Sequence, residues 1–68
     1  MNKFAERLKD LREERGLSQN QLAKLAGVSQ VAISMWEKNL RTPTIDNVIT
    51  LAKIFNVSAD FLIGLTDE

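Results

Sequence analysis

Two short amphipathic segments joined by a Gly-Val-Ser break constrain the fold of this chain more than any other feature. The segments lie within residues 19–38, and the break is Gly27-Val28-Ser29. Gly27 can adopt the positive φ of a tight turn between helices, and the small Ala23 lets two helix backbones approach closely. The pattern predicts two helices that cross at a steep angle. The side chains expected on their inner faces are Leu22, Ala23, Ala26, Val28, Ile33 and Trp36.

Such a pair is typical of a helix-turn-helix. The second helix of that motif faces outward and inserts into the major groove of DNA. A period of 3.6 residues turns Ile33 and Trp36 to one side of the second helix, so that Trp36 is expected in the core. The opposite side carries Gln30, Val31, Ser34, Met35 and Lys38. A core does not explain outward Val31 and Met35, although single exposed apolar residues are also ordinary on protein surfaces.

Capping residues and apolar stripes predict three more helices around this pair. A stripe through Phe4, Leu8 and Leu11 indicates a helix over about residues 3–15, ended by Gly16. The expected N-caps of the other four helices are Ser18, which forms a capping box with Gln21, and Ser29, Thr44 and Ser58. Asn39 is the expected left-handed end of the third helix. The inner faces of the last two helices are expected to be Ile45, Val48, Ile49, Ala52 and Phe55, and then Phe61 and Leu62.

Alternation with a period of two residues is sustained nowhere, so strands are not expected. The prediction is an all-α fold of five short helices that forms a single domain over residues 1–68. A chain of this length buries only about 60% of its unfolded surface, so modest stability is expected.

The composition excludes several functional classes. The chain has no cysteine and no histidine, which excludes disulfides, zinc fingers and histidine-based catalysis. Its acids are scattered over solvated faces, so we expect no enzyme, no metal site, no cofactor and no small-molecule site. No apolar run approaches the ~20 residues that span a bilayer, and the first residues do not resemble a signal peptide. The expectation is a cytoplasmic protein without a membrane partner.

The charge distribution bears on nucleic-acid binding. The formal net charge is zero, whereas DNA-binding domains are usually basic. However, residues 16–43 are net basic and residues 44–68 are net acidic. A dipolar protein of this kind can still present one positive face to phosphate.

The motif residues also support a family resemblance. They are Leu17-Ser18-Gln19, Leu22-Ala23, Gly27-Val28-Ser29, Ile33-Ser34, Trp36-Glu37, Pro43 and the closing stretch Leu51 to Ser58. From Phe4 to Leu65 the chain resembles the Cro/C1-type, phage repressor-like helix-turn-helix family. The resemblance implies a transcriptional regulator, with repression as the expected mode. It also implies a homodimer on double-stranded DNA, and therefore a palindromic operator. A chain of this length could also be the DNA-binding part of a longer repressor.

The resemblance assigns DNA contacts to particular positions. Carried over by position, the base-reading residues are Gln30, Val31, Ser34 and Met35. Glutamine can bond both N6 and N7 of adenine, and apolar side chains suit thymine methyl groups. The expected phosphate contacts are Gln19, at the start of a helix where free N–H groups attract anions, and Lys38, Asn39, Arg41 and Thr42 in the following loop. The family often has glycine in place of Asn39 and polar residues in place of Val31 and Met35.

Two further contacts are expected. Glu37 is the one acid near the proposed DNA face, and the resemblance implies a structural ion pair with Arg12; a half-buried carboxylate also needs such a partner. The C-terminal residues Ile63 and Leu65 are expected to be exposed and to form the dimer contact. The alternative function is a protein-interaction module or antitoxin-type partner that retains the fold with a weakened DNA surface. Zero net charge and apolar Val31 and Met35 favour that alternative.

Overall fold

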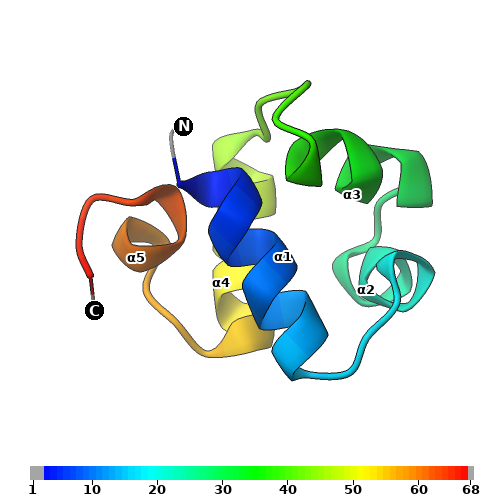
Figure 1. The fold of residues 1–68 in the computed structure, drawn as a ribbon, viewed down its shortest axis with the longest axis horizontal. Coiled ribbons are helices and arrows are strands. Elements are labelled where there is room, and N and C mark those ends of the chain that lie inside the picture. The colour runs from blue at the N-terminus through cyan, green and yellow to red at the C-terminus, as the bar shows by residue number, and fades with distance from the viewer. Residues whose placement is uncertain (1–2, 68) are drawn as a thin grey trace.

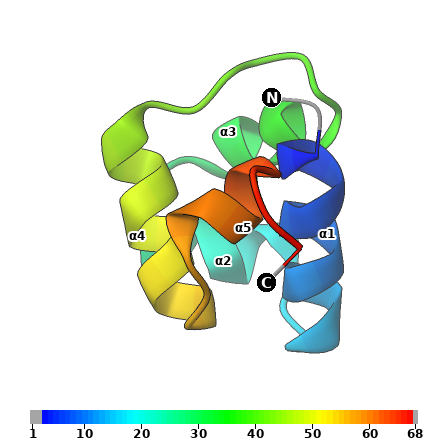
Figure 2. The same cartoon turned by 90° about the vertical axis from the view of Figure 1, so that its left-hand side faces the viewer.

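Five helices and no strands make up the part of the chain that the structure describes, residues 3–67 of a computed structural model. The helices are α1 (Phe4–Glu14), α2 (Gln19–Ala26), α3 (Gln30–Glu37), α4 (Ile45–Phe55) and α5 (Ala59–Ile63). In Figure 1, α2 and α3 lie on one side of α1 and α5 lies on the other. Figure 2 shows α1 and α4 at opposite edges of the molecule, with α5 crossing between them. The expected all-α fold is therefore confirmed.

The helix starts follow the capping residues of the sequence. The side-chain oxygens of Ser18, Ser29, Thr44 and Ser58 each accept a hydrogen bond from the backbone N–H three residues further on, at 2.9–3.2 Å. Ser18 and Gln21 form the predicted reciprocal capping box. Each such cap is worth about 1 kcal/mol relative to alanine, so local sequence contributes substantially to where these short helices begin.

Residues in the left-handed backbone conformation end most of the helices. Gly27 has φ of +70° and Asn39 has φ of +59°, as the sequence predicted for the turns after α2 and α3. A Cβ atom at Gly27 would meet no other atom within 4 Å, so its backbone conformation, rather than space, favours glycine there. Asn56, after α4, also has a positive φ, +55°, which the sequence analysis did not anticipate.

The core is apolar and draws on all five helices. Trp36 is only 3% exposed and packs edge-on against Phe4, with 6.2 Å between ring centroids. The prediction that Trp36 belongs to the core is therefore confirmed. The buried apolar residues are Phe4, Leu8, Leu22, Ala23, Ala32, Ile33, Trp36, Val48, Leu51, Ala52, Phe55 and Leu62. None of the helices in residues 3–67 has the length and apolar character needed to traverse a bilayer.

Three inner-face expectations for α4 and α5 were wrong. On α4, the predicted Val48, Ala52 and Phe55 are buried, but Ile45 and Ile49 are 64% and 41% exposed. The helix is rotated so that Leu51, which was not predicted, completes the buried face in their place. Phe61 is only half-buried, and a guanidinium from α1 covers its ring.

Ile63 and Leu65 were both expected to be exposed. This prediction was wrong for Ile63 and correct for Leu65. Ile63 is half-buried and packs against the core, whereas Leu65 is 74% exposed. Gly64, with φ of +88°, turns the chain back beside Lys3 at the start of α1. The expected pair of exposed apolar residues is thereby reduced to one.

Candidate nucleic-acid interface

The turn between α2 and α3 fixes how α3 is presented. Gly27 ends α2 in the left-handed conformation, and the N–H of Val28 bonds the carbonyl oxygen of Ala23 at 3.0 Å. Ser29 then caps α3 at once, so the connection is only three residues long. The buried residues of α3 face α1 and α2, which leaves the other side of the helix at the surface (Figure 1).

The four predicted base-reading residues lie on or beside this surface. Gln30 is exposed and Val31 is 60% exposed. Ser34 and Met35, one turn further along, are half-buried. The first turn of α3 is therefore its most accessible part, which is the part that a recognition helix inserts most deeply.

The expected ion pair between Arg12 and Glu37 is formed. Arg12 Nε donates to Glu37 Oε2 at 2.7 Å, and Arg12 Nη2 donates to Glu37 Oε1 at 3.0 Å. The two side chains are 12% and 4% exposed, so the pair is largely removed from water. The hydrogen bonding of Arg12 to the Glu37 carboxylate raises the pKa of Arg12 above its usual value, although burial acts in the opposite direction. Arg12 Nη1 also donates to the carbonyl oxygen of Leu17 at 2.8 Å, which ties α1 to the start of α2.

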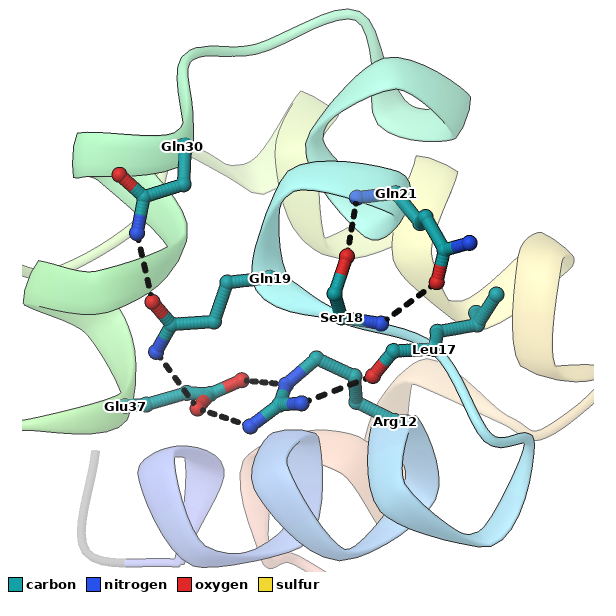
Figure 3. A network of polar contacts seen from close by, with 7 residues as sticks. All are labelled: Arg12, Leu17, Ser18, Gln19, Gln21, Gln30 and Glu37. Atoms are coloured by element: carbon teal, nitrogen blue, oxygen red, sulfur yellow. Dashed lines mark hydrogen bonds and ion pairs between the residues drawn. The ribbon is translucent and has the colours of Figure 1, made fainter.

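Two glutamines extend this ion pair to the surface of α3 (Figure 3). Gln19 Nε2 donates to Glu37 Oε1 at 3.1 Å, and Gln30 Nε2 donates to Gln19 Oε1 at 2.6 Å. A continuous chain of hydrogen bonds therefore runs from Arg12 through Glu37 and Gln19 to Gln30. Sequence reasoning placed Gln19 and Gln30 in separate roles and missed this contact, since residues eleven positions apart carry no pairing signal.

The direction of each hydrogen bond in this chain is set by Glu37. An ionised carboxylate only accepts, so the amide nitrogen of Gln19 faces Glu37 and its oxygen faces Gln30. Gln30 must then present its nitrogen to Gln19. One N–H and the carbonyl oxygen of Gln30 remain available to a ligand, and one N–H of Gln19 remains available beside them.

The loop after α3 is exposed and carries the remaining predicted phosphate contacts. Lys38, Asn39, Arg41 and Thr42 are all exposed, whereas Pro43 is buried and anchors the end of the loop. Within residues 3–67, neither Lys38 nor Arg41 takes part in an ion pair. Leu40, which the sequence analysis did not single out, is 66% exposed in the same loop.

An open groove of about 300 Å³ lies elsewhere on the molecule, along α1 and beside Phe61. Its walls carry both cations, such as Arg7, and carboxylates, such as Asp10. None of the predicted DNA-contacting residues lines it. Among residues 3–67, no group of three acidic, histidine or cysteine side chains is arranged to hold a metal ion.

Comparison with known proteins gives the same interpretation of the fold. The helix-turn-helix family HTH_3 matches residues 8–62. The chain is 32% identical over 65 residues to the uncharacterized HTH-type transcriptional regulator YobD of Bacillus subtilis, covering 96% of this chain and 58% of YobD. It is 38% identical to repressor protein C2 of Salmonella phage P22 over 60 residues, which are 88% of this chain and 28% of C2. It is also 38% identical to the transcriptional activator BcrR of Enterococcus faecalis over 61 residues, which are 90% of this chain and 30% of BcrR. The chain thus spans less than two thirds of the length of these relatives.

Solved structures are similar over nearly the whole chain. The P22 c2 repressor in complex with a synthetic operator superposes with a TM-score of 0.83 at 37% identity, covering 87% of this chain and 89% of that one. The N-terminal DNA-binding domain of SinR from Bacillus subtilis superposes with a TM-score of 0.86 at 31% identity, covering 93% of both chains. By sequence and by fold, this chain belongs to the helix-turn-helix family HTH_3, together with these transcription regulators.

Proposed function

We propose that this chain is a sequence-specific double-stranded DNA-binding domain of a transcription regulator and that α3 reads the major groove of its operator. The relatives' names include both a repressor and an activator. Repression is the simpler mode, because occupying an operator is enough to exclude other proteins from it. The observation that carries the proposal is the hydrogen-bond chain that ends on the exposed amide of Gln30.

The groups left free on Gln30 match adenine. Adenine presents the N7 acceptor and the N6 donor in the major groove, whereas guanine presents two acceptors. Gln30 keeps one N–H for N7 and its carbonyl oxygen for N6, because its other N–H is bonded to Gln19. Two acceptors on guanine would need both N–H groups. Gln30 therefore reads adenine and discriminates against guanine at that position.

The neighbouring side chains complete the proposed surface. Val31, 60% exposed beside Gln30, is suited to a thymine methyl group, and Ser34 and Met35 border it. Gln19 lies at the start of α2, where unpaired N–H groups and the helix dipole attract a phosphate. Lys38, Asn39, Arg41 and Thr42 extend the phosphate contacts along the exposed loop. Phosphate contacts of this kind position the protein, and base contacts specify the sequence.

We further propose that two copies bind one palindromic operator, with recognition helices about 34 Å apart, one turn of DNA. The longest extent of the described residues is 27 Å, so two copies on adjacent turns can touch over only a limited area. Leu65 is available for a small contact near the C-terminus, although Ile63 is largely withdrawn from it.

The decisive experiment is selection of bound duplexes from a random library, followed by affinity measurements over a range of salt concentrations. We expect an enriched palindrome with adenine at one position of each half-site. The affinity should fall steeply as salt is added, since each phosphate contact releases counterions.

The alternative function, a protein-interaction module, is favoured by the zero net charge and by exposed Val31 and Leu40. It predicts no enriched sequence and no salt-dependent binding to duplexes. Binding to a protein partner that is insensitive to salt would support it and would overturn the DNA-binding proposal.

A further inference from the structure

The solvent-facing side of α4 is partly apolar and has no partner among residues 3–67. Ile45 and Ile49, one turn apart, are 64% and 41% exposed. The buried face of the helix, formed by Val48, Leu51, Ala52 and Phe55, is already packed in the core. In Figure 2, α4 stands at one edge of the molecule, where another macromolecule can approach it.

Charged residues of opposite sign flank this apolar strip. Asp46 lies in the first turn of α4 and Lys53 lies in its last turn, and both are exposed. They are seven residues apart, which is two helical turns, so they share one side of the helix with Ile49 between them. Within residues 3–67, neither residue takes part in an ion pair.

A two-fold axis through Ile49 would make this strip complementary to itself. Two antiparallel copies of α4 would place Ile49 against Ile49 of the second copy. Asp46 of each copy would then face Lys53 of the other, so that symmetry creates two ion pairs at once. Antiparallel alignment also sets the positive end of each helix dipole beside the negative end of the other.

We propose that α4 is a self-association surface, at which a second copy of this chain docks in antiparallel orientation through Asp46, Ile49 and Lys53, with Ile45 at the edge. The contact is small, because α4 has only 11 residues. Small interfaces of this kind are characteristic of weak or transient association. The contact therefore forms at high protein concentration.

The test is sedimentation equilibrium of the chain without DNA, up to millimolar concentration. The native chain should show a monomer–dimer equilibrium that weakens with added salt. Asp46→Lys or Lys53→Asp alone should raise the dissociation constant about tenfold, because each change turns two attractive contacts into two repulsive ones. The double variant should recover most of the native affinity. Ile49→Asp, which sets two carboxylates face to face, should abolish association.

The matched control is Lys9→Asp, which makes the same charge change at an exposed position of α1 and should leave association unaltered. Thermal unfolding of every variant checks that it is folded, since the changes on α4 oppose its dipole. A native chain that stays monomeric throughout, or association that Ile49→Asp leaves unchanged, would overturn the proposal. No DNA is present, so either outcome is independent of whether the chain binds an operator.

Discussion

Two arginines on α1 hold opposite halves of the molecule in different ways. Arg12 reaches toward α2 and α3, where a largely buried carboxylate and a carbonyl oxygen accept its hydrogen bonds. Arg7 reaches toward α5 and the C-terminal residues. Its guanidinium donates to the carbonyl oxygen of Phe61 and, at 2.6 Å, to that of Thr66. The guanidinium also lies 4.2 Å from the centre of the Phe61 ring.

The difference lies in what each arginine is connected to. The acceptor of Arg12, Glu37, continues through Gln19 to Gln30 on the proposed DNA surface. The acceptors of Arg7 are mainly backbone oxygens, and its carboxylate partner, Asp67, is 90% exposed. Loss of Arg12 should therefore disturb both stability and recognition, whereas loss of Arg7 should disturb stability alone.

The largest expected effect comes from removing one member of the buried pair. Arg12→Ala or Glu37→Ala leaves the other charge without its ion-pair partner in a site that water barely reaches. Each should lower the free energy of unfolding by about 3–5 kcal/mol, measured by urea denaturation. The matched double variant, Arg12→Met with Glu37→Leu, should lose less than either single variant. A single-variant loss below about 1 kcal/mol would mean that the pair behaves as an exposed one.

The contrast between the two arginines also shows what the sequence could predict. The four N-caps and the Gly27 turn are local signals within a few residues, and the structure contains them all. The Arg12–Glu37 pair was predictable because the family resemblance implies it and because a half-buried carboxylate needs a partner. The Arg7 contacts were not, because backbone carbonyl oxygens exist at every residue and their position depends on the fold. The exposure of Ile45 likewise depends on how α4 is rotated against the core.

The second prediction concerns Gln30, at the surface end of the Arg12 network. Gln30→Ala should weaken operator binding by about 1–3 kcal/mol and relax the preference at one base position. Lys38→Ala is the comparison variant and should weaken all duplexes alike while reducing the salt dependence. Competition binding with single-base operator variants measures both. An unchanged base preference in Gln30→Ala would show that α3 docks differently.

Arg7→Ala tests the other half of the molecule. It removes three hydrogen bonds from a charged donor, two of them to carbonyl oxygens and one to the exposed Asp67, and the contact with the Phe61 ring. We therefore expect a loss of about 2 kcal/mol in the free energy of unfolding. Base preference on the selected operator should stay as in the native chain. A change in base preference in this variant would contradict the separation of the two halves.

Gln19→Ala should affect recognition more than stability. Without Gln19, the second N–H of Gln30 is free, and the amide can turn to give both N–H groups to guanine. The discrimination of adenine over guanine should fall by about 1 kcal/mol, at the low end of the value of a bidentate base contact. Gln21→Ala, which removes one bond of the capping box on the same helix, is the control for altered α2 stability. Equal base discrimination in the native and Gln19→Ala proteins would show that Gln19 does not orient Gln30.

The smallest effect is expected at Asp67. Its carboxylate accepts from Arg7 Nη2 at 3.1 Å and lies 3.9 Å from Lys3 Nζ, but it is 90% exposed, and exposed ion pairs contribute little. Asp67→Asn should therefore leave the urea midpoint unchanged within error, at low and at high salt, because the carbonyl oxygens of Phe61 and Thr66 still hold the guanidinium. A loss of stability as large as that of Arg7→Ala, if it disappeared at high salt, would show that the Asp67 carboxylate holds the C-terminal residues. The two arginines would then differ only in the burial of their acid partners, and not in the kind of group that they bind.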